Sequence, residues 1–186
     1  MKAIYASAYY RGLEALLNMW PKIKEGAPDA TLDIYYGWQS WVAHEGKDAL
    51  YHRIIKLLEK NKELGVREHG RISHAQLAKA MNEADVWLYP TEFEEINCIT
   101  ALKNNAAGNA IVCTDVAALK ETGGPYAQFI ESDVIYSDEY NQQKFIDAAI
   151  KALTSPNKDK KAQKEWAKQF TWEKIAKQWD EVINVS

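Results

Sequence analysis

The stretch WLYPTEFEEINCITALKNNAAGNAIVCT, which runs from Trp87 to Thr114, indicates the fold of the whole chain. Apolar runs at 86–89 and 110–113 are typical of buried strands, and an acidic loop follows the first run. In an open α/β sheet, such a loop lies at the carboxyl end of a strand and faces a helix N-terminus, a place that suits an anionic ligand. The expected helix ends at Gly108, in the left-handed position, and its apolar residues are Ile99, Leu102, Ala106 and Ala107.

Strand-like and helical segments alternate on both sides of this stretch, which predicts a parallel sheet. A capping box, in which Ser73 and Gln76 satisfy backbone groups reciprocally, marks one helix start. The segment 38–48 is expected to be a long irregular connection. We therefore predict a single domain, 1–186, with a Rossmann-like, doubly wound parallel sheet, helices on both faces and further C-terminal helices. The other expected strands are 3–6, 31–36, 66–69 and 130–136.

The composition is that of an ordinary globular protein, since 47% of the 186 residues are apolar, 26% are charged and the net charge is -3. No basic block favours a nucleic-acid partner. No apolar run is long enough for a transmembrane segment, and the N-terminus lacks the apolar region of a signal peptide. Cys98 and Cys113 both fall in the opening stretch, where we expect buried thiols, so a cytoplasmic setting fits best.

Several kinds of active site leave sequence signatures that this chain lacks. It contains no GxSxG, HExxH, CxxC or GxxxxGK[ST] motif, and its four histidines show no ligand spacing, so we assign no metal. No GxGxxG turn follows the first strand, which ranks an NAD-dependent enzyme last. His69, at a strand end, fits a structural histidine better than a ligand-binding one.

Two loops carry the main candidate binding residues. Arg11 precedes Gly12 at the first strand-to-helix junction, where a guanidinium suits a phosphate, although an ordinary exposed arginine is the commoner case. Glu95 precedes a helix N-terminus whose amides, with the side chain of Asn97 or Thr100 as a cap, could close on a phosphate. The residues alone leave open whether Glu95 binds a ligand. Convergence of the two loops, after the first and fourth strands, would mark the topological switch point.

Other residues near these loops could have either a structural role or a role in ligand binding. Glu92 and Glu94 fit a solvated acidic loop better than a ligand site. Lys103 flanks the apolar stripe of its helix, so its side chain either extends outward or points into the cleft. An aromatic cluster could stack on a base or sugar, but packing in the core or at its rim is the commoner use. This cluster consists of Tyr35, Tyr36, Trp38 and Trp41.

At these residues the chain resembles the C-terminal domain of retaining GT-B glycosyltransferases, the family called glycosyl transferases group 1. That family has a strand, Pro-Ser or Pro-Thr, an acidic loop, two glutamates, and a small-residue segment before the next strand. The similarity spans nearly the whole chain in the right order. The matching segments are SAYYRG near the start, Tyr89-Pro90-Thr91, Glu95 as the first glutamate, NNAAGNAIV at 104–112, TDVAALKE ending at Glu121, and FTWEKIAKQW at 170–179.

The resemblance implies a binding site for a nucleotide-sugar donor. In such a site, Arg11 with Gly12 grips the diphosphate, and Glu95 contacts hydroxyls of the transferred sugar, which makes it the catalytic candidate. The other implied donor-binding residues are Ile96, Asn97, Cys98 and Thr100, at phosphate and sugar, and His69, Gly70 and Arg71, near the base.

Two positions depart from the family pattern. Lys103 stands where the family has its second glutamate, which accepts hydrogen bonds from the ribose, whereas lysine only donates. Ser7 stands where the family has a basic residue near the diphosphate. With Ser7 and Lys103 in the donor site, we expect nucleotide binding to be altered but not abolished.

The implied function is transfer of a hexose from a UDP- or GDP-sugar, without a metal or further cofactor, to an unknown acceptor such as a glycan or a lipid. GT-B enzymes place the acceptor and part of the catalytic machinery on an N-terminal domain that these residues do not include. We therefore expect donor binding without efficient transfer. The alternative is a non-catalytic nucleotide-binding or assembly module.

Overall fold

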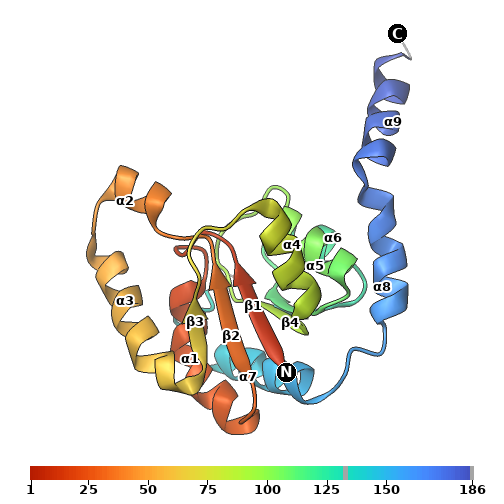
Figure 1. Ribbon diagram of the computed structural model, residues 1–186. Helices are drawn as coiled ribbons and strands as arrows, with labels where there is room; N and C mark the ends of the chain where they lie inside the picture. Colours follow the sequence, from red (N-terminus) through yellow and green to blue (C-terminus); the bar gives the residue numbers. More distant parts are fainter. Residues whose placement is uncertain (132–133, 185–186) are drawn as a thin grey trace.

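Six parallel strands form one sheet in the computed structural model, which describes residues 1–131 and 134–184. The strand order is β3-β2-β1-β4-β5-β6, so the chain starts near the middle, moves to one edge and then crosses to the other side (Figure 1). This order confirms the predicted Rossmann-like, doubly wound fold. The strands are β1 (Lys2–Ala6), β2 (Thr31–Tyr35), β3 (Val66–Glu68), β4 (Val86–Tyr89), β5 (Ala110–Thr114) and β6 (Ala127–Ile130).

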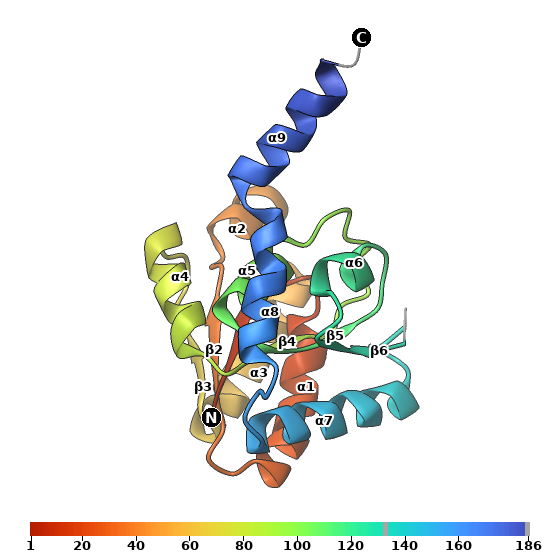
Figure 2. The ribbon, with the colours of Figure 1, turned by 90° about the vertical axis from the view of Figure 1, so that its right-hand side faces the viewer.

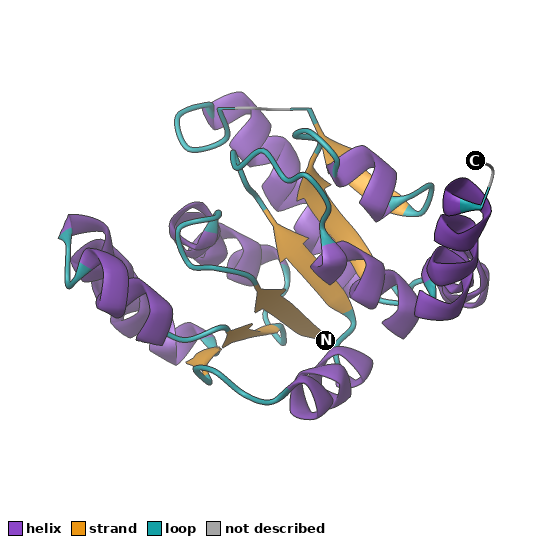
Figure 3. Ribbon diagram, turned by 90° about the horizontal axis from the view of Figure 1, so that it is seen from above, coloured by secondary structure: helices purple, strands orange, loops and turns teal. Residues whose placement is uncertain are grey.

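Helices cover both faces of the sheet (Figures 1 and 3). On one face α1 packs against α3 and α7, and on the other α5 packs against α4, α6 and α8. The helices are α1 (Leu13–Gly26), α2 (Gln39–Glu45), α3 (Ala49–Asn61), α4 (His74–Glu83), α5 (Ile99–Ala107), α6 (Leu119–Gly123), α7 (Glu139–Thr154), α8 (Lys160–Ala167) and α9 (Trp172–Ile183), with short 3-10 helices at Lys62–Leu64 and Lys168–Phe170.

Local sequence signals explain where several elements begin and end. Both hydrogen bonds of the predicted capping box at Ser73 form at the start of α4. Gly108 ends α5 with φ 76°, as expected for a left-handed cap. The central strands are almost fully buried, because helices cover both of their faces. The apolar face of α1 is buried as well.

The structure differs from two predicted elements. The segment expected to be an irregular connection contains α2, a two-turn helix. Because α2 has no buried residue, its sequence has no apolar stripe from which the helix could be predicted. The strand expected at 130–136 lies earlier, because β6 ends at Ile130. Part of that predicted strand, at 132–133, falls outside the described residues.

The inward face of α5 also differs from the expected apolar stripe. Ile99 is 50% exposed, whereas Asn104 and Asn105 are buried. The Asn105 amide donates to the carbonyls of Thr122 and Gly123 at 3.2 and 3.0 Å, and it accepts from Gln163 of α8 at 2.9 Å. Paired amides can therefore occupy this interior without the cost of unsatisfied polar groups, and the buried face of α5 includes them.

The last helices extend the chain beyond the sheet. Figure 2 shows α8 in front of α5 and α9 extending away from the body of the domain. Trp172 and Trp179 of α9 are both exposed. In residues 1–131 and 134–184, no helix has the length and apolar character needed to cross a membrane.

Candidate functional site

The loops that follow β1 and β4 meet at the carboxyl ends of these neighbouring strands. Between β1 and β4 the connections change direction, because the chain runs from β1 toward one edge of the sheet and from β4 toward the other. This position is therefore the topological switch point. Arg11 lies in the first loop and Glu95 in the second, and Arg11 Nη1 is 3.3 Å from both carboxylate oxygens of Glu95. The predicted convergence of the two loops is thus confirmed.

A tyrosine at the end of β4 holds the Glu95 side chain in place. Glu95 is only 7% exposed, and the Tyr89 hydroxyl donates to its Oε1 at 2.6 Å. Burial and this hydrogen bond raise the pKa of Tyr89 well above its ordinary value, so the hydroxyl stays protonated and remains a donor. The Ser7 hydroxyl lies 3.2 Å from the Tyr89 hydroxyl. Ser7, Tyr89, Glu95 and Arg11 therefore form one connected polar cluster.

Aromatic side chains surround the Arg11 guanidinium. Its Nε donates to the Tyr10 hydroxyl at 3.3 Å, and its Cζ lies 3.8 Å from the centre of the Phe93 ring. Burial acts to lower the pKa of Arg11, but the bond to Tyr10 and the charge of Glu95 outweigh it and raise the pKa. A permanent positive charge is therefore fixed beside Glu95.

Gly12 allows the two loops to approach so closely. Its φ of 116° belongs to the left-handed region, and a Cβ on this residue would lie 2.3 Å from the Pro90 carbonyl oxygen. The backbone after Arg11 is thus in direct contact with the backbone after β4, and only glycine combines this conformation with this contact. Gly12 places Arg11 within reach of Glu95.

The N-terminus of α5 differs from the expected capping arrangement. Cys98 is the N-cap and makes no side-chain cap, and the predicted caps from Asn97 and Thr100 are wrong. The Thr100 hydroxyl instead donates to the Ala6 carbonyl at 3.2 Å, which ties α5 to the end of β1. Ile96 and Asn97 are exposed, whereas Cys98 is 5% exposed and burial raises the pKa of its thiol to about 12. Cys98 and Cys113 are both free, buried thiols, as expected.

His69, Gly70 and Arg71 lie beyond β2, away from the Arg11–Glu95 pair along the sheet edge. His69 Nε2 is 2.8 Å from Asp33 Oδ1, and its ring stacks on Tyr35 with centres 4.7 Å apart, which suits a structural histidine. The Gly70 carbonyl accepts from the Tyr36 amide at 3.1 Å. Arg71 has its side chain in a separate cavity.

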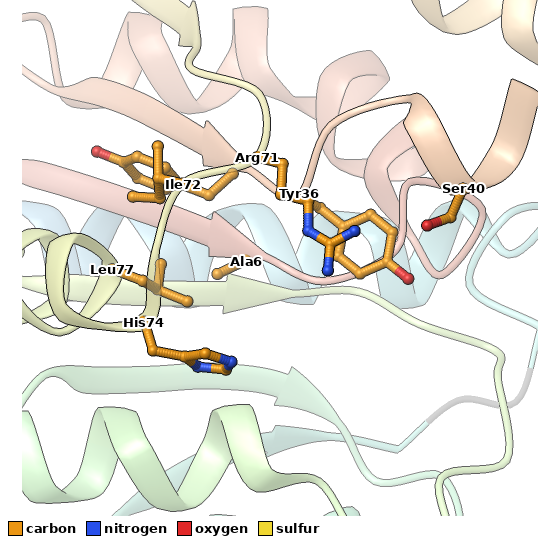
Figure 4. A pocket seen from close by; sticks show the side chains of 8 residues that line it. Ala6, Tyr36, Ser40, Arg71, Ile72, His74 and Leu77 are labelled. Carbon is orange, nitrogen blue, oxygen red and sulfur yellow. The ribbon is translucent and has the colours of Figure 1, made fainter.

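This cavity, of about 210 Å³, lies at the carboxyl ends of β1 and β2. Figure 4 shows Arg71, Tyr36 and Ser40 on one side of it and His74 and Leu77 on the other. It therefore combines a permanent cation, an aromatic ring and apolar surface next to the loop that carries Ser7.

Lys103 is exposed and lies in a groove between α4 and α5. The groove shares His74 and Leu77 with the cavity beside Arg71, so the two hollows are neighbours. The side chain of Lys103 is open to solvent, which fits the outward one of its two predicted orientations. The structure thus brings together Ser7, Arg11 and Glu95, and it places Arg71 and Lys103 in adjoining hollows.

Three residues in or beside the polar cluster are not predicted as site residues. The sequence pattern places Tyr89 only in an apolar strand and in the family segment Tyr89-Pro90-Thr91, and it marks neither Tyr10 nor Phe93. A tyrosine hydroxyl at the carboxyl end of a buried strand needs a partner, and this need is the signal that could have identified Tyr89. No comparable signal marks Tyr10 or Phe93.

Comparison with known proteins assigns the family. The family model of glycosyl transferases group 1 matches residues 2–155, and the chain belongs to this family. A search of curated proteins gives no match. Among solved structures the fold is similar to the pneumococcal O-GlcNAc transferase GtfA in complex with UDP and GlcNAc, with a TM-score of 0.73 and 18% identity over 98% of this chain and 35% of that one.

A second similar structure is WaaG, a glycosyltransferase involved in lipopolysaccharide biosynthesis. The TM-score is 0.68 and the identity 15%, over 100% of this chain and 47% of WaaG. The chain therefore has the fold of one domain of GT-B glycosyltransferases and spans about a third to a half of the length of these neighbours, 35% and 47%.

Proposed function

We propose that this chain is the donor-binding domain of a retaining, metal-independent hexosyltransferase that uses a UDP- or GDP-sugar. The observation that carries the proposal is the Arg11–Glu95 pair at the switch point, held by Tyr89. A buried carboxylate with its oxygens fixed suits sugar hydroxyls, and an adjacent guanidinium suits a diphosphate. Membership of a glycosyltransferase family supports this assignment.

Donor binding would redistribute the contacts of Arg11. In the structure its charge is offset by Glu95, and a diphosphate would bring a second anion to the same guanidinium. Amides near the N-terminus of α5, from Ile96 to Thr100, would add hydrogen bonds and a favourable helix dipole. Glu95, released in part from Arg11, would then accept from hydroxyls of the transferred sugar, while Tyr89 keeps it in place.

The nucleoside would occupy the cavity beside Arg71. Tyr36 offers a ring for stacking on a base, and Arg71 and His74 offer donors to its carbonyls. His69 and Gly70 would support this cavity from the loop after β3. The free, buried thiols fit a reducing, cytoplasmic setting.

Transfer would require a second domain that carries the rest of the catalytic machinery and of the acceptor site, because the chain spans only 35% of GtfA. We expect the chain alone to bind the donor without efficient transfer to a glycan or lipid acceptor. In the alternative, a non-catalytic assembly module, the site would bind no nucleotide, so one titration separates the two functions.

Isothermal titration calorimetry with UDP and with GDP tests the proposal. We expect millimolar or tighter binding of at least one nucleotide, and Arg11→Ala should weaken it about tenfold to hundredfold by removing a charged hydrogen-bond donor. Arg53→Ala is the matched control, because it breaks another arginine–glutamate pair, in which Arg53 Nε of α3 is 2.6 Å from Glu14 Oε1 of α1. Absence of binding by both nucleotides would contradict donor binding.

Lys103→Glu tests the departure from the family pattern. The exchange restores an acceptor for ribose hydroxyls in the groove next to the cavity, so we expect UDP and GDP affinity to rise about threefold to tenfold. Calorimetry measures the change, and Lys79→Glu, at an exposed lysine of α4, repeats the change of charge outside the groove. Equal affinities of wild type and Lys103→Glu would exclude a role for this residue.

A further inference from the structure

A second pocket, of about 540 Å³, lies between α2, the start of α3 and the loop after β1. Its volume falls within the range of small-molecule sites. Figure 1 shows α2 at the same end of the sheet as the β1 and β4 loops. Tyr10 lines the pocket and accepts the hydrogen bond from Arg11, so the pocket adjoins the Arg11–Glu95 pair.

Aromatic rings form much of the pocket wall. Tyr10 is 44% exposed, and its ring centre lies 5.3 Å from that of Trp41. Tyr36 also lines the pocket, is 45% exposed, and lies between this pocket and the cavity beside Arg71, since it lines both. It has φ 146°, a costly conformation for a residue with a side chain, of the kind found at binding sites. Exposed rings at this position are available for stacking.

Polar side chains lie among these rings. Ser40, His44 and Glu45 all line the pocket and are exposed, so their hydroxyl, imidazole and carboxylate groups are accessible to a ligand. A ligand in the pocket can therefore find both hydrogen-bond donors and acceptors that are otherwise exposed to water.

The charge of the lining excludes a phosphate as the main recognised group. Glu45 and Asp48 contribute carboxylates, whereas no lysine or arginine is among the described residues that line the pocket. An anion would therefore meet like charge and find no permanent cation. Aromatic faces combined with carboxylate acceptors suit a neutral ligand that has apolar ring faces and many hydroxyls.

We propose that this pocket binds a neutral saccharide and serves as a subsite for the acceptor, next to the donor site. Its role as an acceptor subsite rests on the proposed function. Saccharide binding by the pocket does not depend on the proposed function. The pocket residues differ from those assigned to the nucleotide, apart from Tyr36 and Ser40 on the shared wall.

Saturation-transfer NMR of the full chain with glucose, N-acetylglucosamine, maltose and lactose tests this proposal. We expect saturation transfer to at least one saccharide at millimolar concentration, with affinity reduced about tenfold in Trp41→Ala. Glu45→Gln, at an exposed residue, should weaken binding without affecting folding. Trp172→Ala, at an exposed tryptophan of α9, is the matched control and should bind like the wild type.

UDP titration of the same samples separates this proposal from the proposed function. Saccharide binding without UDP binding would support the pocket and contradict the donor site. UDP binding without any saccharide signal would overturn the pocket while leaving the donor site intact. Equal saccharide affinity of the wild type, Trp41→Ala and Glu45→Gln would also overturn it.

Discussion

Gly12→Ala is expected to lower the free energy of unfolding by about 2–5 kcal/mol, the sum of backbone strain and overpacking. The strain arises because φ is 116° at this residue, a conformation that a residue with a Cβ adopts only at a cost. The overpacking arises because the new methyl group would lie 2.3 Å from the Pro90 carbonyl oxygen, a backbone atom that cannot rotate away. For a domain of ordinary stability, this loss is a large fraction of the total.

Urea denaturation followed by circular dichroism measures this loss. Gly46→Ala is the control, because Gly46 also has a positive φ, of 70°, but nothing lies within 4 Å of its added Cβ. Only the strain applies there, so we expect a loss of about 1 kcal/mol. If the two variants lose the same stability, the contact between the loops contributes nothing beyond the backbone conformation of Gly12.

Glu95→Gln is expected to remove the advantage of a nucleotide sugar over the free nucleotide. The wild-type carboxylate would accept hydrogen bonds from the transferred sugar, and losing its charge should weaken the binding of UDP-glucose or UDP-N-acetylglucosamine about tenfold to hundredfold. Binding of UDP alone should be unchanged or tighter, because Arg11 would no longer be offset by Glu95. The two ligands should therefore respond in different ways.

Competition calorimetry with UDP and the two UDP-sugars measures both responses. Glu94→Gln is a close control, since Glu94 is the neighbouring residue, carries the same charge and is exposed. Thermal unfolding of each variant shows whether the loss of the charge beside Arg11 alters folding. Weakening of UDP and UDP-sugar by the same factor would assign Glu95 to the support of Arg11 rather than to the sugar.

Much of the fold follows from local signals in the sequence. The buried runs at β1, β4 and β5, the capping box at Ser73 and the left-handed Gly108 all lie where the residue pattern predicts them. Each of these signals depends on neighbours in the chain. The α2 helix has no such signal, because a helix without a buried residue needs no apolar periodicity.

The misread face of α5 has a different cause. Asparagine is a polar residue that rarely lies inside a helix interface, so a pattern of apolar residues cannot place Asn104 or Asn105 there. The burial of Asn105 depends on acceptors in α6 and on a donor in α8, both of which lie beyond its own helix. Only the three-dimensional structure brings these groups together.

The sequence predicts the main residues of the site but not the contacts between them. Arg11 and Glu95 were expected on converging loops as separate ligands for phosphate and sugar. That they pair with each other depends on the close backbone approach at Gly12 and on the Tyr89 hydroxyl. Such distances of a few ångströms between loops are not encoded in residue spacing.

The hydrogen bonds around Asn105 show that the folded unit extends beyond the part of the chain that the family model matches. The family match ends at residue 155, yet Gln163 donates to Asn105 at 2.9 Å and to the Asn109 carbonyl at 2.8 Å, and Asn157 donates to the Gly108 carbonyl at 3.1 Å. The helix α5, which begins near Glu95, is thus anchored at its far end by residues that follow the part of the chain matched by the family model. Evolutionary change in α8 can therefore alter the position of the proposed donor site without touching any residue that the family model matches.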